Sequence, residues 1–301
     1  IGITDKSIVE LVANRIQKLP KATQQVLQLA ACIGDRFTLD VLSVVNEKSP
    51  VTTANELDVA LQAGLILPLS EAYKIPLVFG EEVENDDKDT DYQKFYTNNF
   101  KLNIAKVSYR FLHDRVQQAS YSFIPESERQ ATHLKIGRLL LKQTSIDLLK
   151  ENILNIVNQF NFGLDLLTEE SEKSELAQLN LLAGKKAKTA TAYENASKYL
   201  NISLELVEPE SWQNNYEFIF DLYIETAEVE YLKGSFIESD NLCNISLKQA
   251  KTILDKARIY EIQIQSNVAQ NRMAEALEIG IKVLKILGVS LKIKPKIHHL
   301  L

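Results

Sequence analysis

The sequence predicts a mainly α-helical protein: a winged-helix domain with a small β-hairpin, followed by a superhelix of α-α hairpin repeats resembling tetratricopeptide (TPR) repeats. Three observations support this prediction. Apolar residues recur at helical spacing before residue 64, two short extended runs flank a long insert, and similar turn-and-helix segments recur after residue 125. We expect a winged-helix domain in residues 1–124, with an acidic wing insert in residues 74–105, and TPR-like repeats in residues 125–301.

Four helices are expected before the first strand. Residues 7–10 read as a capping box, in which a Ser or Thr side chain and a Glu three residues later satisfy the free amides of a helix start. Pro20 suits the first turn of a second helix. A short third helix covers residues 38–46. A second capping box, residues 53–56, starts a fourth helix that Gly64 ends.

Two extended runs, residues 65–69 and 107–112, are expected to pair as the β-hairpin. Pro68 marks the first run as an edge strand or a strand end, because proline cannot donate to a neighbouring strand. Between the runs, residues 81–91 are strongly acidic, and we interpret them as a flexible, solvated loop. Four aromatic residues follow at helical spacing and either fold the insert onto its own domain or form a partner-docking face: Tyr92, Phe95, Tyr96 and Phe100.

Three later segments share one form: a turn residue, any residue, a large apolar residue, two more residues and a small residue. They begin at Thr191, Gly234 and Asn271, spaced by 43 and 37 residues, and each is expected to precede a helix. Since TPR repeats have a period of about 34 residues, we expect lengthened TPR-like hairpins. An irregular helical bundle with chance similarity is the alternative.

The charge of the chain is concentrated in the insert. Residues 81–91 contain seven acidic residues and one Lys, so their formal charge equals the −6 of the whole chain. The remainder is formally neutral, which gives no general attraction to nucleic acid or to a membrane surface.

Cys32 and Cys243 lie far apart within helical patterns, which is typical of buried free thiols in a reducing compartment. The uncharged runs are much shorter than the about 20 residues of a membrane helix, so we expect a cytoplasmic protein. The one Met is Met273, and we therefore expect the chain to be a segment of a longer protein.

Enzyme motifs are incomplete in this sequence. Gly184-Lys185-Lys186 resembles the end of a phosphate-binding loop, but Leu179 occupies the position of the second Gly, and Lys186 that of the Ser or Thr. We interpret this segment as a solvated basic helix face. The four His and two Cys show no metal-ligand spacing. We expect no catalytic residue, no metal site and no enzymatic activity in this chain.

A winged helix raises the question of DNA binding. The expected recognition helix and its surroundings, residues 51–67, contain no Lys or Arg but carry Glu56 and Asp58. These acids would repel the phosphates that supply most non-specific DNA affinity. We expect no nucleic-acid partner. The alternative is a DNA-binding transcriptional regulator that uses the repeat arm for dimerisation.

His113 is the residue with the sharpest functional interpretation. It lies at the expected strand–helix corner, just before an expected helix cap at Asp114. An imidazole at a helix start can donate to an anion, with help from the helix dipole. The other interpretation is a His that forms a hydrogen bond within the wing and so fixes the corner.

Two blocks of the sequence resemble a known family. They resemble the region that follows the ATPase core in large bacterial signalling proteins, which join a serine/threonine kinase and a STAND-class signal-transduction ATPase to helical repeats, a GAF sensor and often a histidine kinase. The resemblance covers essentially the whole chain. Motifs of the kinases, the phosphate-binding loop and the GAF domain are absent, so their activities are not carried over. The two blocks are residues 19–37 and 111–121.

The resemblance implies a regulatory segment: a winged-helix lid that packs on ADP held by the neighbouring ATPase domain of the same polypeptide, and a repeat arm that senses a protein or small-molecule inducer. It implies no cofactor in this chain, and ATP or ADP in the parent protein. His113 matches the family position of a winged-helix His that touches nucleotide phosphate. The resemblance therefore implies that His113 contacts the ADP phosphate.

Overall fold

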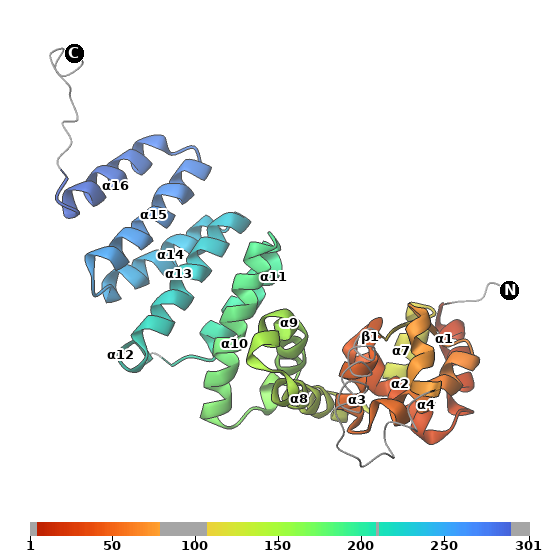
Figure 1. The fold of residues 1–301 in the computed structure, drawn as a ribbon. Helices are drawn as coiled ribbons and strands as arrows, with labels where there is room; N and C mark the ends of the chain where they lie inside the picture. The colour runs from red at the N-terminus through yellow and green to blue at the C-terminus, as the bar shows by residue number, and fades with distance from the viewer. Residues whose placement is uncertain (1–4, 79–106, 209–210, 290–301) are drawn as a thin grey trace. The chain divides into compact units, whose positions relative to one another are not determined.

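The computed structural model describes residues 5–78, 107–208 and 211–289, and it is mainly α-helical, as the sequence predicts (Figure 1). The acidic run 81–91 and the aromatic group 92–100 lie outside the described residues. The chain divides into two compact units, Ile1–Leu166 and Leu167–Leu301. The expected domain division after residue 124 stays a prediction.

The first unit combines helices with a small antiparallel sheet. Its elements, in chain order, are α1 (Asp5–Gln17), α2 (Lys21–Ile33), β1 (Arg36–Thr38), α3 (Leu39–Asn46), α4 (Pro50–Gln62), β2 (Ile66–Pro68), the 3-10 helix η1 (Glu71–Tyr73), β3 (Ser108–Phe111), α7 (Asp114–Ser122), α8 (Glu126–Gln143), α9 (Ile146–Phe162) and the 3-10 helix η2 (Leu164–Leu166).

The sheet has the strand order β1-β3-β2, with both pairings antiparallel. The predicted pairing of the two extended runs is confirmed, with Ile66 opposite Phe111 and Pro68 opposite Tyr109 on the edge strand β2. β1 was not predicted, because three residues are too short to show an alternating pattern. Its Phe37 stacks on Tyr109, with ring centroids 5.8 Å apart. This order of helices and strands is that of the predicted winged helix.

Two predicted helix starts are displaced. α1 begins at Asp5, before the expected cap at Ser7. α4 begins at Pro50, and the Ser49 hydroxyl caps it by accepting a hydrogen bond from the amide three residues on, at 3.1 Å. Residues 53–56 therefore lie inside α4 rather than at its start. A Ser followed by Pro is the stronger start signal, because proline is already shaped for the first helical position and needs no amide partner there.

A buried polar network joins the α8–α9 hairpin to the winged helix. His133 of α8 is 7% exposed; its Nε2 lies 3.1 Å from the Tyr121 hydroxyl of α7 and its Nδ1 lies 2.6 Å from Gln159 Oε1 of α9. Gln159 Nε2 in turn donates to the backbone carbonyl of Cys32, at 2.9 Å. A carbonyl only accepts, so Gln159 Oε1 must face His133, whose Nδ1 then donates and whose Nε2 accepts from Tyr121. Neutral His133 satisfies every bond in this network.

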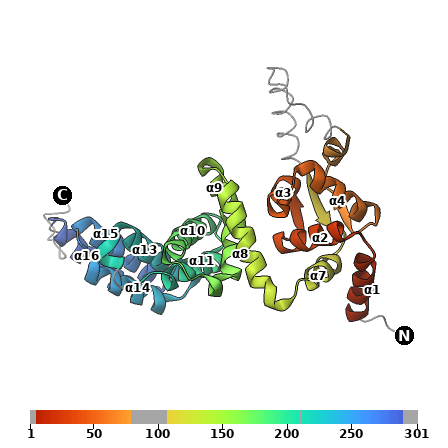
Figure 2. The ribbon, with the colours of Figure 1, turned by 90° about the horizontal axis from the view of Figure 1, so that it is seen from below.

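The second unit consists of paired helical hairpins. Helices α10 and α11, α13 and α14, and α15 and α16 pack against each other as neighbours in sequence (Figures 1 and 2). The predicted hairpin repeats are confirmed. Their bounds are α10 (Glu170–Thr189), α11 (Tyr193–Glu205), α12 (Ser211–Asn214), α13 (Tyr216–Lys233), α14 (Phe236–Gln249), α15 (Ile253–Ala269) and α16 (Met273–Ile286).

The three hairpins share one turn structure. The turn residues Thr191, Gly234 and Asn271 have φ values of 58°, 95° and 60°, in the left-handed region. In each turn the next residue donates its amide to a carbonyl five positions back, which is the Schellman ending of a helix. These bonds are Ala192 N to Ala187 O at 2.9 Å, Ser235 N to Glu230 O at 2.8 Å and Arg272 N to Asn267 O at 2.8 Å. The recurring sequence form therefore encodes a recurring turn.

The Gly184-Lys185-Lys186 segment lies within α10, at a close contact with α11. A Cβ atom on Gly184 would lie 2.6 Å from Leu200 Cγ, so this glycine lets the two helices approach each other. The prediction of a solvated basic face was incomplete, because Lys185 and Lys188 form ion pairs with acidic residues of α13, among them Asp221. The segment serves helix packing within the repeat.

Replacing Gly184 with Ala should reduce the free energy of unfolding by about 1–3 kcal/mol, because the added methyl group overpacks the α10–α11 contact. Gly280→Ala is the matched control: it is also within a helix, but its Cβ would meet only Ile264 Cδ1 at 3.9 Å. That variant should be more stable by about 0.5–1 kcal/mol. Urea unfolding of both variants tests this, and an unchanged Gly184→Ala protein would contradict it.

Stability should fall as the pH is lowered past the ordinary pKa of histidine. Burial lowers the pKa of His133 below its usual 6.5, although the hydrogen bond with Gln159 acts in the opposite direction. The unfolded chain therefore binds the proton more readily, and stabilisation present above pH 6.5 is lost as the pH falls from there toward the lower folded-state pKa. NMR titration of the imidazole measures this pKa directly. In His133→Gln this component of the pH dependence of urea unfolding should disappear; an equal dependence in both proteins would contradict the assignment.

Candidate functional site

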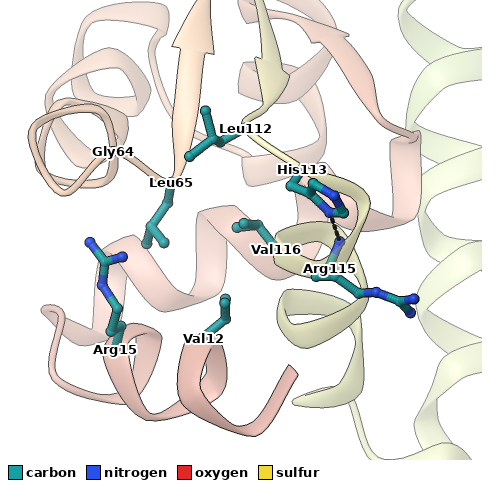
Figure 3. A pocket seen from close by; sticks show the side chains of 8 residues that line it. All are labelled: Val12, Arg15, Gly64, Leu65, Leu112, His113, Arg115 and Val116. Atoms are coloured by element: carbon teal, nitrogen blue, oxygen red, sulfur yellow. Dashed lines mark hydrogen bonds between the residues drawn. The ribbon is translucent and has the colours of Figure 1, made fainter. Parts of the chain in front are cut away.

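His113 occupies the corner between β3 and α7. It is the N-cap of α7 in an extended conformation, with φ −155° and ψ 150°, and its Nδ1 accepts a hydrogen bond from the Arg115 amide at 3.1 Å (Figure 3). The sequence prediction of a cap at Asp114 was wrong, since Asp114 is the first residue of the helix. The imidazole nitrogen takes the place that an Asp or Asn side-chain oxygen usually has at a helix start.

The hydrogen bond at Nδ1 determines which nitrogen of the neutral His113 ring carries the proton. Because Nδ1 accepts, Nε2 carries the proton of the neutral ring and is a donor. The side chain is exposed, and within the described part of the chain no hydrogen bond to Nε2 is found. One nitrogen therefore fixes the corner, and the other can donate to a group outside this chain.

His113 lies on a cavity of about 550 Å³ formed by α1, the segment before β2 and the start of α7 (Figure 3). This volume is in the range of small-molecule sites in proteins. The walls are mainly apolar, with polar groups from Arg15, His113 and Arg115. The lining residues are Val12, Arg15, Gly64, Leu65, Leu112, His113, Arg115 and Val116.

Two arginines accompany His113 at this cavity. Arg15 Nη2 donates to the Ala63 carbonyl at 2.7 Å, which holds the guanidinium beside the segment before β2. Arg115 Nη1 donates to Gln118 Oε1 at 2.9 Å, and Figure 3 shows its guanidinium pointing away from Arg15. Asp114 adds one negative charge in the first turn of α7. Arg15, the Nε2 donor of His113 and the positive end of the α7 helix dipole make this cavity suitable for an anionic group.

Sequence reasoning found His113 but not Arg15. Arg15 is nearly a hundred residues earlier in the chain and lies in an ordinary amphipathic helix, so no local pattern marks it. Only the packing of α1 against α7 brings the two together. Arg115 was visible in the same block as His113, but its orientation could not be read from the sequence.

The α4 surface is acidic. Glu56 forms an ion pair with Lys48 at 2.5 Å and accepts a hydrogen bond from Asn46 at 2.9 Å, while Asp58 accepts one from Gln62 at 2.5 Å. α4 itself contains no Lys or Arg. This surface opposes a nucleic-acid phosphate backbone.

The described residues can also be compared with the requirements of a cysteine nucleophile, a metal site and a membrane-spanning helix. Burial raises the pKa of the Cys32 and Cys243 thiols to about 12, which disfavours the thiolate that a nucleophile needs. In residues 5–78, 107–208 and 211–289, no cluster of three His, Cys, Asp or Glu residues could hold a metal ion. Over the same ranges, no helix is both long and apolar enough to cross a bilayer.

Comparison with known proteins finds a similarity to part of one much longer protein. It is 29% identical to Hybrid signal transduction histidine kinase G of Dictyostelium discoideum over 315 aligned residues, which cover 95% of this chain and 9% of that protein. The chain thus spans about a tenth of the length of the curated relative it matches. No protein-family model and no solved structure matches it. The chain is a distant homologue of a segment of a hybrid signal transduction histidine kinase.

Proposed function

We propose that this chain is a non-catalytic regulatory segment of a larger cytoplasmic signalling protein. In this proposal the winged helix covers the nucleotide of a neighbouring ATPase domain, and the helical repeats bind a protein or small-molecule inducer. The observation that carries the proposal is the cavity at the start of α7, where the His113 Nε2 donor and Arg15 lie around apolar walls. The homology to a segment of a histidine kinase supports a place within a multidomain signalling protein.

The proposed parent combines a STAND-class ATPase with serine/threonine kinase, GAF sensor or histidine kinase domains. ATP or ADP would be bound by the ATPase domain, and this chain would contribute only a lid. The sequence blocks 19–37 and 111–121, which resemble that family, form α2 and the β3–α7 corner. Of the two, the second block contributes residues to the cavity, namely Leu112, His113, Arg115 and Val116.

A hydrogen bond from His113 to the nucleotide phosphate would stabilise the state in which the lid is closed on ADP relative to the open state. A hydrogen bond to a charged group contributes about 1.5–3 kcal/mol. Shifting a two-state equilibrium from one extreme to the other takes about 5.5 kcal/mol. The His113 bond therefore needs further interface contacts, and the apolar cavity walls contributed by Val12 and Leu112 are available for them.

DNA-binding regulation is the alternative function. It would require the winged helix to meet the duplex through α4, where Glu56 and Asp58 lie and basic residues are absent. The acidic α4 surface favours the regulatory role.

Replacing His113 with Ala in the longer protein should speed ADP release by about tenfold to a hundredfold, because one hydrogen bond to a phosphate is lost. His113→Ser separates contact from capping, since Ser is a good helix cap but does not reach as far. Both variants should release ADP faster, and only Ala should lower the stability of α7. Stopped-flow release of a fluorescent ADP analogue measures the rate.

Unchanged ADP release in both variants would contradict a contact between His113 and the nucleotide. Faster release in the Ala variant alone would show that the effect comes from loss of the helix cap rather than from loss of a nucleotide contact. As a control, the 301-residue chain by itself should neither hydrolyse ATP nor bind it tightly, which isothermal titration calorimetry can check.

Duplex DNA should not bind the chain in a salt-dependent manner. The test is fluorescence anisotropy of a labelled duplex, measured at low and at physiological salt. An affinity that falls steeply as salt rises would indicate phosphate contacts and would favour the DNA-binding alternative.

A further inference from the structure

The two ends of α7 lie at two different places in the first unit. His113 caps the first turn, at the cavity, and Tyr121 of the last turn enters the buried network with His133. Nine residues of helix separate the two ends by about 13 Å. Between them Gln117 Nε2 donates to the Ala31 carbonyl of α2 at 3.2 Å, and α7 packs against α1 and α2. α7 is thus one continuous helix that connects the cavity to the α8–α9 hairpin.

The contacts at the Tyr121 end bind the hairpin in a specific orientation. The His133 ring lies between Tyr121, with centroids 5.8 Å apart, and Phe162 of α9, at 4.1 Å. The Arg129 guanidinium of α8 stacks on the Tyr121 ring at 4.9 Å, and its Nε donates to the Ile124 carbonyl at 3.3 Å. Residues from α7, α8 and α9 therefore meet at one point.

A second contact between the hairpin and the winged helix lies at α3, which packs against α8. Between α3 and the α8–α9 hairpin lies a cavity of about 150 Å³, lined in part by Val44 and Ile156, so packing there is incomplete. The Lys135–Glu47 ion pair across this contact is largely exposed, and such pairs contribute little. The directional hydrogen bonds between buried groups at α7 therefore act together with the α3–α8 packing to determine the orientation of the hairpin.

We propose that α7 couples the cavity to the α8–α9 hairpin through the network of Tyr121, His133, Gln159 and the Cys32 carbonyl. The network has one consistent direction: Tyr121 donates to His133, His133 to Gln159, and Gln159 to Cys32. A displacement of α7 that removes the Tyr121 donor leaves His133 Nε2 buried without a partner, which is costly. The hairpin then loses one of the two contacts that fix its orientation, the other being the α3–α8 packing. That nucleotide binding at His113 triggers the displacement rests on the proposed function, whereas the coupling between α7 and the hairpin does not.

Hydrogen exchange of the nucleotide-free 301-residue chain tests the coupling. Tyr121→Phe keeps the ring and removes only the hydroxyl, so it should raise exchange in α8 and α9 by about threefold to tenfold. Tyr216→Phe is the matched control, because it removes a hydroxyl that donates to Asp255 at 2.7 Å in the second unit. It should leave α8 and α9 unchanged.

The decisive variant is His113→Ala at the opposite end of α7. It should raise exchange in α8 and α9 by about twofold or more, and this effect should vanish when Tyr121→Phe is already present, because coupled sites are non-additive. Ser49→Ala removes the cap of α4 in the same unit and controls for general loosening. It should not change exchange in α8 and α9.

Three outcomes would overturn the coupling: no change in α8–α9 exchange in Tyr121→Phe, additive effects of the two α7 variants, or an equal effect of Ser49→Ala. The assay contains no nucleotide, so it is independent of the ADP-release experiment. If the exchange experiment shows coupling but ADP release is unchanged, the network proposal holds and the nucleotide contact of His113 is contradicted. If ADP release changes but the exchange experiment shows no coupling, the nucleotide contact holds and the coupling is contradicted.

Discussion

The antiparallel pairing of β3 with both β1 and β2 is the constraint on which the first unit depends. β3 returns to the sheet after residues 74–105 and takes the central place, with Tyr109 and Phe111 buried beneath the helices. Its end determines where α7 begins, since His113 follows it by two residues. α7 in turn places Tyr121 against α8. The position of one four-residue strand therefore sets the cavity and the attachment of the α8–α9 hairpin.

Much of this architecture could be predicted from the sequence because its signals are local. The pairing of the two extended runs, the short third helix and the three hairpin turns follow from apolar spacing and turn residues within a few positions. Thr191 and Asn271 were recognisable as turn residues through their similarity to Gly234, although a β-branched Thr rarely adopts a positive φ. The recurrence of the same sequence form three times identified these turns, which the residue types at Thr191 and Asn271 alone would not have done.

The features that could not be predicted depend on contacts distant in sequence. β1 exists because β3 offers it a partner, and its own three residues are uninformative. Arg15 joins His113 only through helix packing. His133 lies in a helix with no functional motif, and its role follows from Tyr121 and Gln159, which approach it from two other helices. Pattern reasoning treats each helix separately, whereas these sites arise where helices meet.

The hydrogen-bond network around His133 ends at the main-chain carbonyl of Cys32, so the residue type at position 32 is free to differ among relatives. Any amino acid at position 32 presents the same carbonyl, so the Cys32 side chain can change without loss of the acceptor. Tyr121, His133 and Gln159 have no such freedom, because each supplies a donor or acceptor that the next one requires. Substitutions at these three positions should therefore occur together across homologous sequences, while position 32 varies with the packing of α2 alone.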